Sequence, residues 1–265
     1  MKTQRHAMNS PQTIQVGRDE KAPFVAFGDD SQYGDSLAFA FVLVPRTRLR
    51  FAERKLERLK KRFKIPQHVT LHCRTLFSGQ QREKSGLGHL SPSDVRSIAA
   101  QAITIINDVN ARVHFAVQDA TTFFASLGNE LQLYNQDGSP SVKLPVTPDP
   151  KGLLGMMAFS CFPLNQNGRY GPTASQCEIY VSEDKTKVGF IGEKRTRADS
   201  HYAGFLDIGN ACVQLNANIV AADAIPLLQL ADIASYICSH AFSKTGDVQF
   251  WKDQCARITN WFRVG

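Results

Sequence analysis

Apolar residues recur along the chain in two patterns, short continuous runs typical of buried strands and longer stretches with helical spacing. The first two runs, residues 24–28 and 36–45, are separated by the polar segment DDSQYGDS. Gly and Asp residues in such a segment favour a turn. The two runs therefore predict a β-hairpin, with Asp29 and Asp30 at the end of its first strand.

The remaining periodicity predicts alternating strands and helices. Further strands are expected at residues 65–73, 111–120, 177–187 and 211–220, and helices at 46–64, 91–107, 121–135, 153–162, 223–242 and 248–262. Ser91 is a good N-cap for the second of these helices. The segments between these elements read as loops, a mobile one at 74–92 and a long one at 136–151. Alternation after an opening hairpin predicts the α/β class, with a mixed β-sheet flanked by helices.

The helix expected at residues 223–242 carries a charge inside an apolar stretch. Pro226 suits its first turn, and the residues from Leu227 onward are mostly apolar. Steps of three and four residues select one narrow polar stripe: Gln229, Asp232, Tyr236, Ser239 and His240. The stripe either faces solvent or is buried. If it is buried, Asp232 is either a carboxylate that caps another segment or a metal ligand.

Length and composition are those of an ordinary globular protein. The 265 residues, 43% hydrophobic and 21% charged, are expected to form a single domain over 23–265, with an inserted loop near 128–151 and a flexible arm at 1–22. The six cysteines form no CxxC pair, which favours reduced thiols in a cytoplasmic protein. The longest apolar stretch, residues 37–44, is too short to span a bilayer, so no membrane partner is expected.

Positive charge is concentrated in one segment. The net charge is +7, while residues 46–64 hold ten Lys or Arg against two Glu. Leu49, Ala52, Leu56, Leu59 and Phe63 would form the core face of a helix, and Arg50, Arg54, Arg58, Lys61 and Arg62 would lie on the opposite side. This side is either a solvated face or a phosphate-binding one. For the second interpretation the nucleic-acid contacts are Arg54, Arg58 and Lys61, together with Lys185 and Lys187 of a later basic stretch.

Acidic residues stand where several expected strands end. Asp29 and Asp30, Asp119, and Glu183 and Asp184 hold such positions. Ligands of open α/β sheets gather where strand ends meet, and Asp232 on the helix could join these acids there. Clustered carboxylates need a cation, and Mg²⁺ or Mn²⁺ prefers oxygen ligands. For Asp119 the role of a helix N-cap is favoured.

Four segments resemble a known family. FGDDSQYG, LHCRTL, IYVSEDK and ADAIPLLQLADIASY are similar to motifs of the large prokaryotic family called domain of unknown function 3800 (DUF3800), over roughly residues 24–242. The resemblance implies a ribonuclease H-like fold in which clustered acids and a divalent metal cut or move nucleic-acid strands. Its most specific part is the sequence Leu228-Gln229-Leu230-Ala231-Asp232.

The resemblance assigns roles to individual residues. Asp29 stands at the first acid and Asp30 at the following glutamate, while Asp184 and Asp232 match the later acids. The metal ligands implied are Asp29, Asp30, Asp184 and Asp232, and the catalytic set is Asp29, Asp184 and Asp232, with a metal-bound water as nucleophile. A slip of one residue would bring Asp30 or Glu183 to the ligand positions instead.

Two further positions bear on whether the expected site is active. His72 matches the family's histidine, whereas Thr70 stands where the family often has glutamate. The function expected is therefore a metal-dependent nuclease acting on RNA or DNA. The alternatives are a catalytically degenerate nucleic-acid-binding or assembly subunit of the same fold, and a hydrolase of small phosphorylated molecules. The oligomeric state, a homodimer included, is left open.

Overall fold

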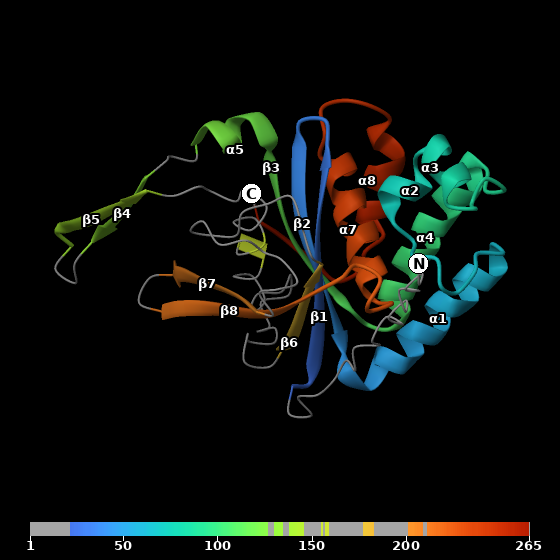
Figure 1. Cartoon of the computed structure of the whole chain (residues 1–265), viewed down its shortest axis with the longest axis horizontal. Helices are drawn as coiled ribbons and strands as arrows, with labels where there is room; N and C mark the ends of the chain where they lie inside the picture. The colour runs from blue at the N-terminus through green and yellow to red at the C-terminus, as the bar shows by residue number, and fades with distance from the viewer. Residues whose placement is uncertain are drawn as a thin grey trace, which may run out of the picture.

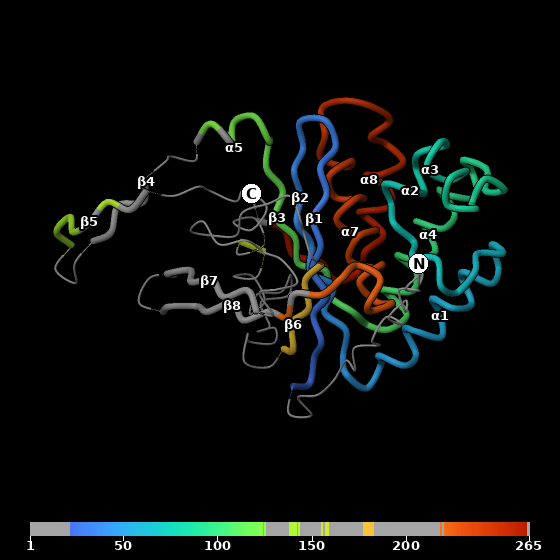
Figure 2. Tube along the Cα trace, viewed as in Figure 1, coloured from blue at the N-terminus to red at the C-terminus, as the bar shows by residue number. Residues whose placement is uncertain are grey.

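The computed structural model describes residues 22–126, 130–134, 138–145, 155, 157–158, 177–182, 201–208 and 211–264. Several expectations lie outside these residues. They concern the arm at 1–21, most of the helix expected at 153–162, and the site residues Asp184, Lys185 and Lys187. Figure 2 follows the Cα trace of the chain, coloured from blue at the N-terminus to red at the C-terminus.

A seven-stranded mixed sheet forms the centre of the protein, in the order β7-β8-β6-β1-β2-β3-β9. Its strands are β1 (Phe24–Tyr33), β2 (Ser36–Pro45), β3 (Arg112–Asp119), β6 (Cys177–Ser182), β7 (His201–Ile208), β8 (Ala211–Val220) and β9 (Trp261–Val264). Strands β1, β2 and β3 are antiparallel neighbours. Strand β6 runs parallel to β1, and β8 parallel to β6. The expected α/β class, with a mixed sheet that opens in a hairpin, is confirmed.

The hairpin is longer than the sequence predicted. Strands β1 and β2 pair over their whole lengths, and the turn between them is only Gly34-Asp35. Gly34 has a φ of +55°, a conformation that glycine adopts without steric cost. Asp29 pairs with Ala40 and Asp30 with Phe39, so the two acids lie inside a strand. Their predicted place at a strand end is wrong, because pairing with the apolar strand β2 extends β1 through the polar residues.

Most helices cover one face of the sheet (Figure 1). They are α1 (Leu49–Arg62), α2 (Cys73–Leu76), α3 (Gly79–Lys84), α4 (Pro92–Asp108), α7 (Leu228–Ala241) and α8 (Val248–Ala256). A 3-10 turn, η1 (Arg46–Arg48), precedes α1, and α5 (Ala120–Ser126) follows β3. Strands β4 (Glu130–Tyr134) and β5 (Pro140–Pro145) form a separate two-stranded sheet.

The main core lies between this helical layer and the sheet. Strand residues of one parity face the helices, among them Val25, Phe27, Ala38, Ala40 and Val42. Residues of the other parity, including Ala26, Leu37, Phe39 and Phe41, form a second buried cluster on the opposite face. Helix α7 packs against both β1 and β2, and all of its residues except Tyr236 are buried. Its burial on all sides explains why its sequence is apolar nearly all round.

Two helices agree with the sequence in detail. In α4, Ser91 accepts a hydrogen bond from the Asp94 N–H, and the Asp94 carboxylate accepts one from the Ser91 N–H, a complete capping box. In α1 the expected core positions from Leu49 to Leu59 are buried and Phe63 packs against them. All five cations expected on the opposite side are exposed: Arg50, Arg54, Arg58, Lys61 and Arg62.

The strand expected at residues 65–73 is wrong. Helix α1 ends at Arg62, Lys64 after it is left-handed, and the Ile65 N–H donates back to the Lys60 carbonyl at 2.9 Å. The chain then turns at Pro66 and enters α2 at Cys73. The mobile loop expected at 74–92 is also wrong, because α2 and α3 occupy much of it.

Other boundaries differ because strands replace expected helix or loop. The helix expected at 121–135 ends at Ser126 and β4 follows, while β5 lies within the loop expected at 136–151. The last expected helix ends at Ala256, and Trp261 begins β9. Helix α7 begins at Leu228, so Pro226 lies in the turn before it. Strand β7 was not predicted.

Among the described helices, none combines the length and the apolar character needed to cross a membrane.

Candidate acidic site between a strand and a helix

Alternation along β1 decides which of the two neighbouring aspartates faces α7. Val25 and Phe27 belong to the helix-side core, so Asp29 has the same orientation and Asp30 the opposite one. Later residues of the same parity contact α7 directly. The Ser239 hydroxyl donates to the Ser31 hydroxyl at 3.2 Å. Asp29, and not Asp30, therefore faces α7.

Three segments that are distant in the sequence meet beside Asp29. A small cavity of about 10 Å³ is lined by Asp29 of β1, Asp232 and Gln229 of α7, and Thr70 and His72 of the loop between α1 and α2. This volume is near the minimum that accommodates one water-sized particle. The structure therefore brings together two of the acids predicted for the site, the predicted histidine, and the threonine that stands in the place of an acid.

Helix α7 holds this loop through two of its buried polar side chains. The Gln229 Oε1 atom accepts the Leu71 N–H at 2.7 Å, and the Asp232 Oδ2 atom accepts the Cys73 N–H at 2.6 Å. Cys73 is the first residue of α2, so Asp232 caps that short helix. The interpretation of the stripe as solvent-facing is wrong, and the interpretation of Asp232 as a buried capping carboxylate is confirmed.

The charge of Asp232 disfavours the ionised form of Asp29. Burial and the nearby charges of Asp232 and Asp30 raise the pKa of Asp29 well above its ordinary value, and an opposing effect of His72 is smaller. Asp29 accepts one hydrogen bond within the described residues, from the N–H of Asp30 at 2.9 Å. The ionised form of Asp29 is thus poorly compensated by protein groups.

His72 supplies the positive charge at the site. Its Nδ1 atom lies 3.5 Å from Asp232 Oδ2, and a hydrogen bond to Asp232 is the main cause that raises the pKa of His72 to about 9. The imidazole is therefore a cation at neutral pH. About half of the His72 side chain is exposed, against 11% of the Asp232 side chain. His72 thus presents its charge to solvent beside the buried acids.

The donor atoms suit a hard divalent cation in kind but not in number. Asp29, Asp232 and Thr70 offer oxygen atoms, which Mg²⁺ and Mn²⁺ prefer, whereas His72 Nδ1 is paired with Asp232. Within the described part of the chain no group of three His, Cys, Asp or Glu residues is placed to hold a metal. Strand β6 is described as far as Ser182, next to β1, and the predicted ligand Asp184 lies two residues beyond.

Asp119 lies elsewhere and has the structural role that was favoured. Its Oδ1 atom accepts the Thr122 N–H at 3.0 Å at the start of α5, as an N-cap does. Its Oδ2 atom accepts from Lys244 Nζ at 2.7 Å, and this contact is the main cause that lowers the pKa of Asp119 to about 2. On β2, Asp119 lies opposite Ser36, beside the hairpin turn. Asp29 lies opposite Ala40, four residues further along the same strand.

Three of the predicted nucleic-acid contacts form a row on α1. Arg54, Arg58 and Lys61 are exposed, and they make no ion pair with any described residue. Other cations of the segment are engaged. Arg46 pairs with Glu178 at 2.7 Å, and Lys55 with Asp108 at 2.7 Å.

The sequence identified the stripe on α7 but not the contacts of its members. His240 stacks on Tyr33 with ring centroids 3.6 Å apart, and Ser239 reaches Ser31. The stripe at steps of three and four was the available signal, since polar residues on a buried helix need partners. What the sequence lacked was the identity of the facing segments.

Comparison of the chain with protein-family models, with curated proteins and with solved structures gave no match.

Proposed function

We propose that the protein is a metal-dependent hydrolase of phosphodiester bonds in nucleic acid, with Asp29 and Asp232 as metal ligands. The observation that carries this proposal is the meeting of these two carboxylates at one cavity, where Asp29 has no hydrogen-bond partner among the described residues except the neighbouring backbone. A buried carboxylate that lacks partners is costly, so the position of Asp29 supports a ligand that compensates its charge.

Two carboxylates are enough for the way in which proteins commonly bind Mg²⁺. Mg²⁺ is commonly bound by one or two carboxylates, with the remaining positions filled by water and substrate phosphate. When bound, the metal would polarise a phosphoryl oxygen and stabilise the charge that develops during hydrolysis. Asp184, the third acid that the resemblance implies, is retained as a proposed ligand.

The chain's own residues would orient the substrate. His72 is cationic and half-exposed beside the acids, a position suited to pairing with a phosphate oxygen. The Thr70 hydroxyl can donate to a second oxygen in the same cavity. Gln229 and Asp232 fix the backbone that carries both residues, which keeps their geometry defined before substrate binds.

Two further observations support the choice of nucleic acid as substrate. The exposed row of Arg54, Arg58 and Lys61 provides positive charge for a phosphate backbone. A mixed sheet that opens with an antiparallel hairpin and adds strands parallel to β1 agrees with the ribonuclease H-like expectation.

A cleavage assay with matched variants tests the proposal. Labelled RNA, DNA and hybrid duplexes are incubated with Mg²⁺ or Mn²⁺ and the wild type, Asp29→Asn, Asp232→Asn or Asp30→Asn. The first two variants should lose about 100-fold or more in rate, since even outer partners of a metal contribute 10- to 100-fold. Asp30→Asn is the control, because its side chain leaves β1 on the opposite face. Cleavage that survives both ligand substitutions, or no cleavage with either metal, contradicts the proposal.

One observation favours the non-catalytic alternative. Thr70 lies at the cavity where the family often has an acid, and the described residues hold only two carboxylates there. A degenerate nucleic-acid-binding subunit would bind its partner without cleavage, and a chelator would not weaken the complex. Binding and cleavage that both depend on metal would exclude this alternative.

A further inference from the structure

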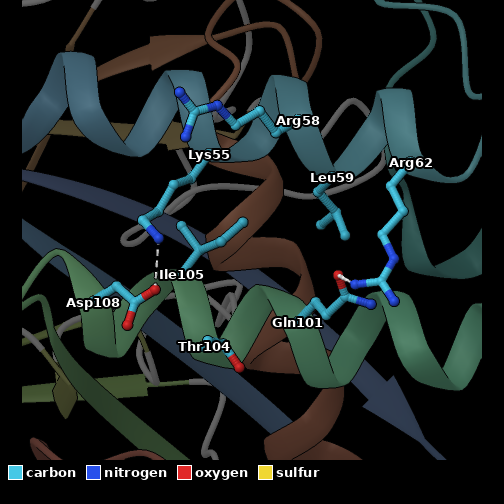
Figure 3. A pocket seen from close by; sticks show the side chains of 8 residues that line it. All are labelled: Lys55, Arg58, Leu59, Arg62, Gln101, Thr104, Ile105 and Asp108. Carbon is cyan, nitrogen blue, oxygen red and sulfur yellow. Dashed lines mark hydrogen bonds and ion pairs between the residues drawn. The ribbon is translucent and has the colours of Figure 1, made fainter.

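Helices α1 and α4 enclose a groove on the helical side of the protein. Its volume is about 250 Å³, and Figure 3 shows its lining side chains. Leu59 of α1 and Ile105 of α4 provide its apolar part. The polar residues around them come from both helices: Lys55, Arg58, Arg62, Gln101, Thr104 and Asp108.

Positive charge exceeds negative charge in this groove. Among the described residues Asp108 is the one acid that lines it, and Lys55 pairs with that carboxylate at 2.7 Å. Arg62 donates to the neutral amide oxygen of Gln101 at 3.1 Å, so its charge is not compensated there (Figure 3). Arg58 has no hydrogen bond or ion pair among the described residues, and Figure 3 shows it lying along α1.

A third arginine, from a different segment, contacts a residue that lines the groove. Arg257, just after α8, donates to the Thr104 hydroxyl at 3.3 Å and to Gln254 Oε1 at 2.6 Å. Both acceptors are neutral, and Arg257 is exposed. Arg58 and Arg62 thus line the groove and Arg257 lies next to its Thr104 edge, and no described carboxylate pairs with any of the three.

The row on α1 continues this positive surface. Arg54, Arg58 and Lys61 follow one another at steps of four and three residues, which are about 6 and 4.5 Å along a helix. The repeat presents charges along a line rather than at a point. A linear polyanion matches that arrangement better than a compact one.

We propose that the α1–α4 groove, with Arg58, Arg62 and Arg257 at its rim, is an exosite for the phosphate backbone of a nucleic-acid strand, bound without regard to base sequence. Guanidinium groups bind phosphate oxygens in pairs of parallel hydrogen bonds. This inference rests on the proposed substrate class but not on the acidic site. It adds to that site a second, separate contact with the same strand.

An anionic membrane is a weaker candidate for the occupant. Amphipathic helices that bind membranes insert an apolar face into the lipid. The apolar face of α1 is instead buried in the core, where Leu49, Ala52 and Leu56 lie. Only its charged side is open to a partner.

Salt-dependent binding tests the exosite in the absence of catalysis. Fluorescence anisotropy is measured with two labelled oligonucleotides of unrelated sequence, in EDTA, between 50 and 200 mM salt. The log of the binding constant falls with log salt at about 0.7–0.9 per phosphate neutralised. The triple variant Arg58→Gln/Arg62→Gln/Arg257→Gln should lower this slope by about 2–3. The affinity ratio of wild type to variant should then shrink about 20- to 40-fold across that range.

Controls separate this result from general loss of charge or of fold. Lys84→Gln removes one exposed cation on α3, which does not line the groove, and should leave the slope unchanged. Thermal unfolding confirms that the triple variant is folded. An unchanged slope in a folded triple variant overturns the exosite. So does loss of binding to phosphatidylserine vesicles with no change in nucleic-acid binding, which indicates a membrane surface instead.

The same assay distinguishes failure of the exosite from failure of the hydrolase proposal. Asp29→Asn should keep the wild-type slope in EDTA, because its side chain is not part of the groove. If the slope depends on the three arginines but the protein does not cleave nucleic acid, the exosite is supported and the hydrolase is contradicted. If the protein cleaves nucleic acid but the triple variant has the wild-type slope, the hydrolase is supported and the exosite is contradicted.

Discussion

The imidazole of His240 is expected to make the protein lose stability as the pH falls. Only 4% of this residue is exposed, and its ring packs against Tyr33, Tyr236 and Trp251, with centroid distances of 3.6, 3.9 and 5.0 Å. Its Nδ1–H donates to the Tyr236 carbonyl at 2.9 Å. Burial among these rings disfavours the charged form and lowers the pKa of His240 to about 4.

The size of the effect follows from the two states. In the unfolded chain the imidazole binds a proton near pH 6.5, while in the folded protein it does so only near pH 4. Above pH 6.5 the imidazole is neutral in both states and costs no stability. As the pH falls from 6.5 to 4, only the unfolded chain takes up the proton, so unfolding is progressively favoured. At about 1.4 kcal/mol per tenfold change in proton affinity, the full loss is about 3 kcal/mol, of which about 2 kcal/mol has appeared at pH 5.

Urea unfolding at pH 7 and pH 5 measures this loss, with His240→Phe and His240→Gln as variants that cannot titrate. The free energy of unfolding of the wild type should fall by about 2 kcal/mol more than that of either variant, since all other groups are shared. The phenylalanine variant keeps a ring against Tyr33 and the glutamine variant does not. Equal pH dependence in wild type and both variants would refute the reasoning.

Three further predictions concern the acidic site. Asp29→Asn should raise the free energy of unfolding at pH 7 in the presence of a chelator. The folded state raises the pKa of the Asp29 carboxyl, so at any pH above the ordinary pKa of an aspartate its ionisation opposes folding, and Asn removes this cost. A variant less stable than wild type contradicts this. Added Mg²⁺ should then stabilise the wild type but not the variant, as a ligand specific to the folded state does. The imidazole of His72 should titrate near pH 9 by NMR in the metal-free protein and closer to 6.5 in Asp232→Asn. The protonated imidazole therefore adds to the free energy of unfolding below pH 6.5, and this addition is lost as the pH rises through about 9. Identical titration in the two proteins would exclude Asp232 as the cause.

Elements with a strong local pattern could be predicted from the sequence. The capping box at Ser91 and the apolar face of α1 are encoded within a few residues, and both are present in the structure. The hairpin was predicted as well, though its turn was placed too early. Asp and Gly residues signalled a turn after Gly28, but ten successive residue pairs with β2 continue the strand to Tyr33.

The loop at residues 65–72 shows why part of the site could not be predicted. Alternating Val69 and Leu71 imitate a strand, so local pattern favoured the wrong element. The contacts that fix this loop come from Gln229 and Asp232, which lie 158 and 159 residues away from their partners. No local signal contains that information, and without it the position of His72 beside Asp232 could not be derived.

The polar stripe of α7 gains its meaning from its partners. Gln229 binds the Leu71 backbone, Ser239 binds Ser31, and the ring of His240 lies on Tyr33. Each of these contacts offsets the cost of burying a polar group, and together they fix the register of the helix against β1 and the loop.

Asp29 is the exception on the facing strand. Its own neighbour Asp30 provides its one hydrogen bond among the described residues, and the nearest carboxylate repels it. The polar side chains of α7 named above have partners, whereas the ionised form of Asp29 is poorly compensated. Functional sites are where such local inconsistencies are expected, so Asp29 is the residue on which the proposed chemistry most depends.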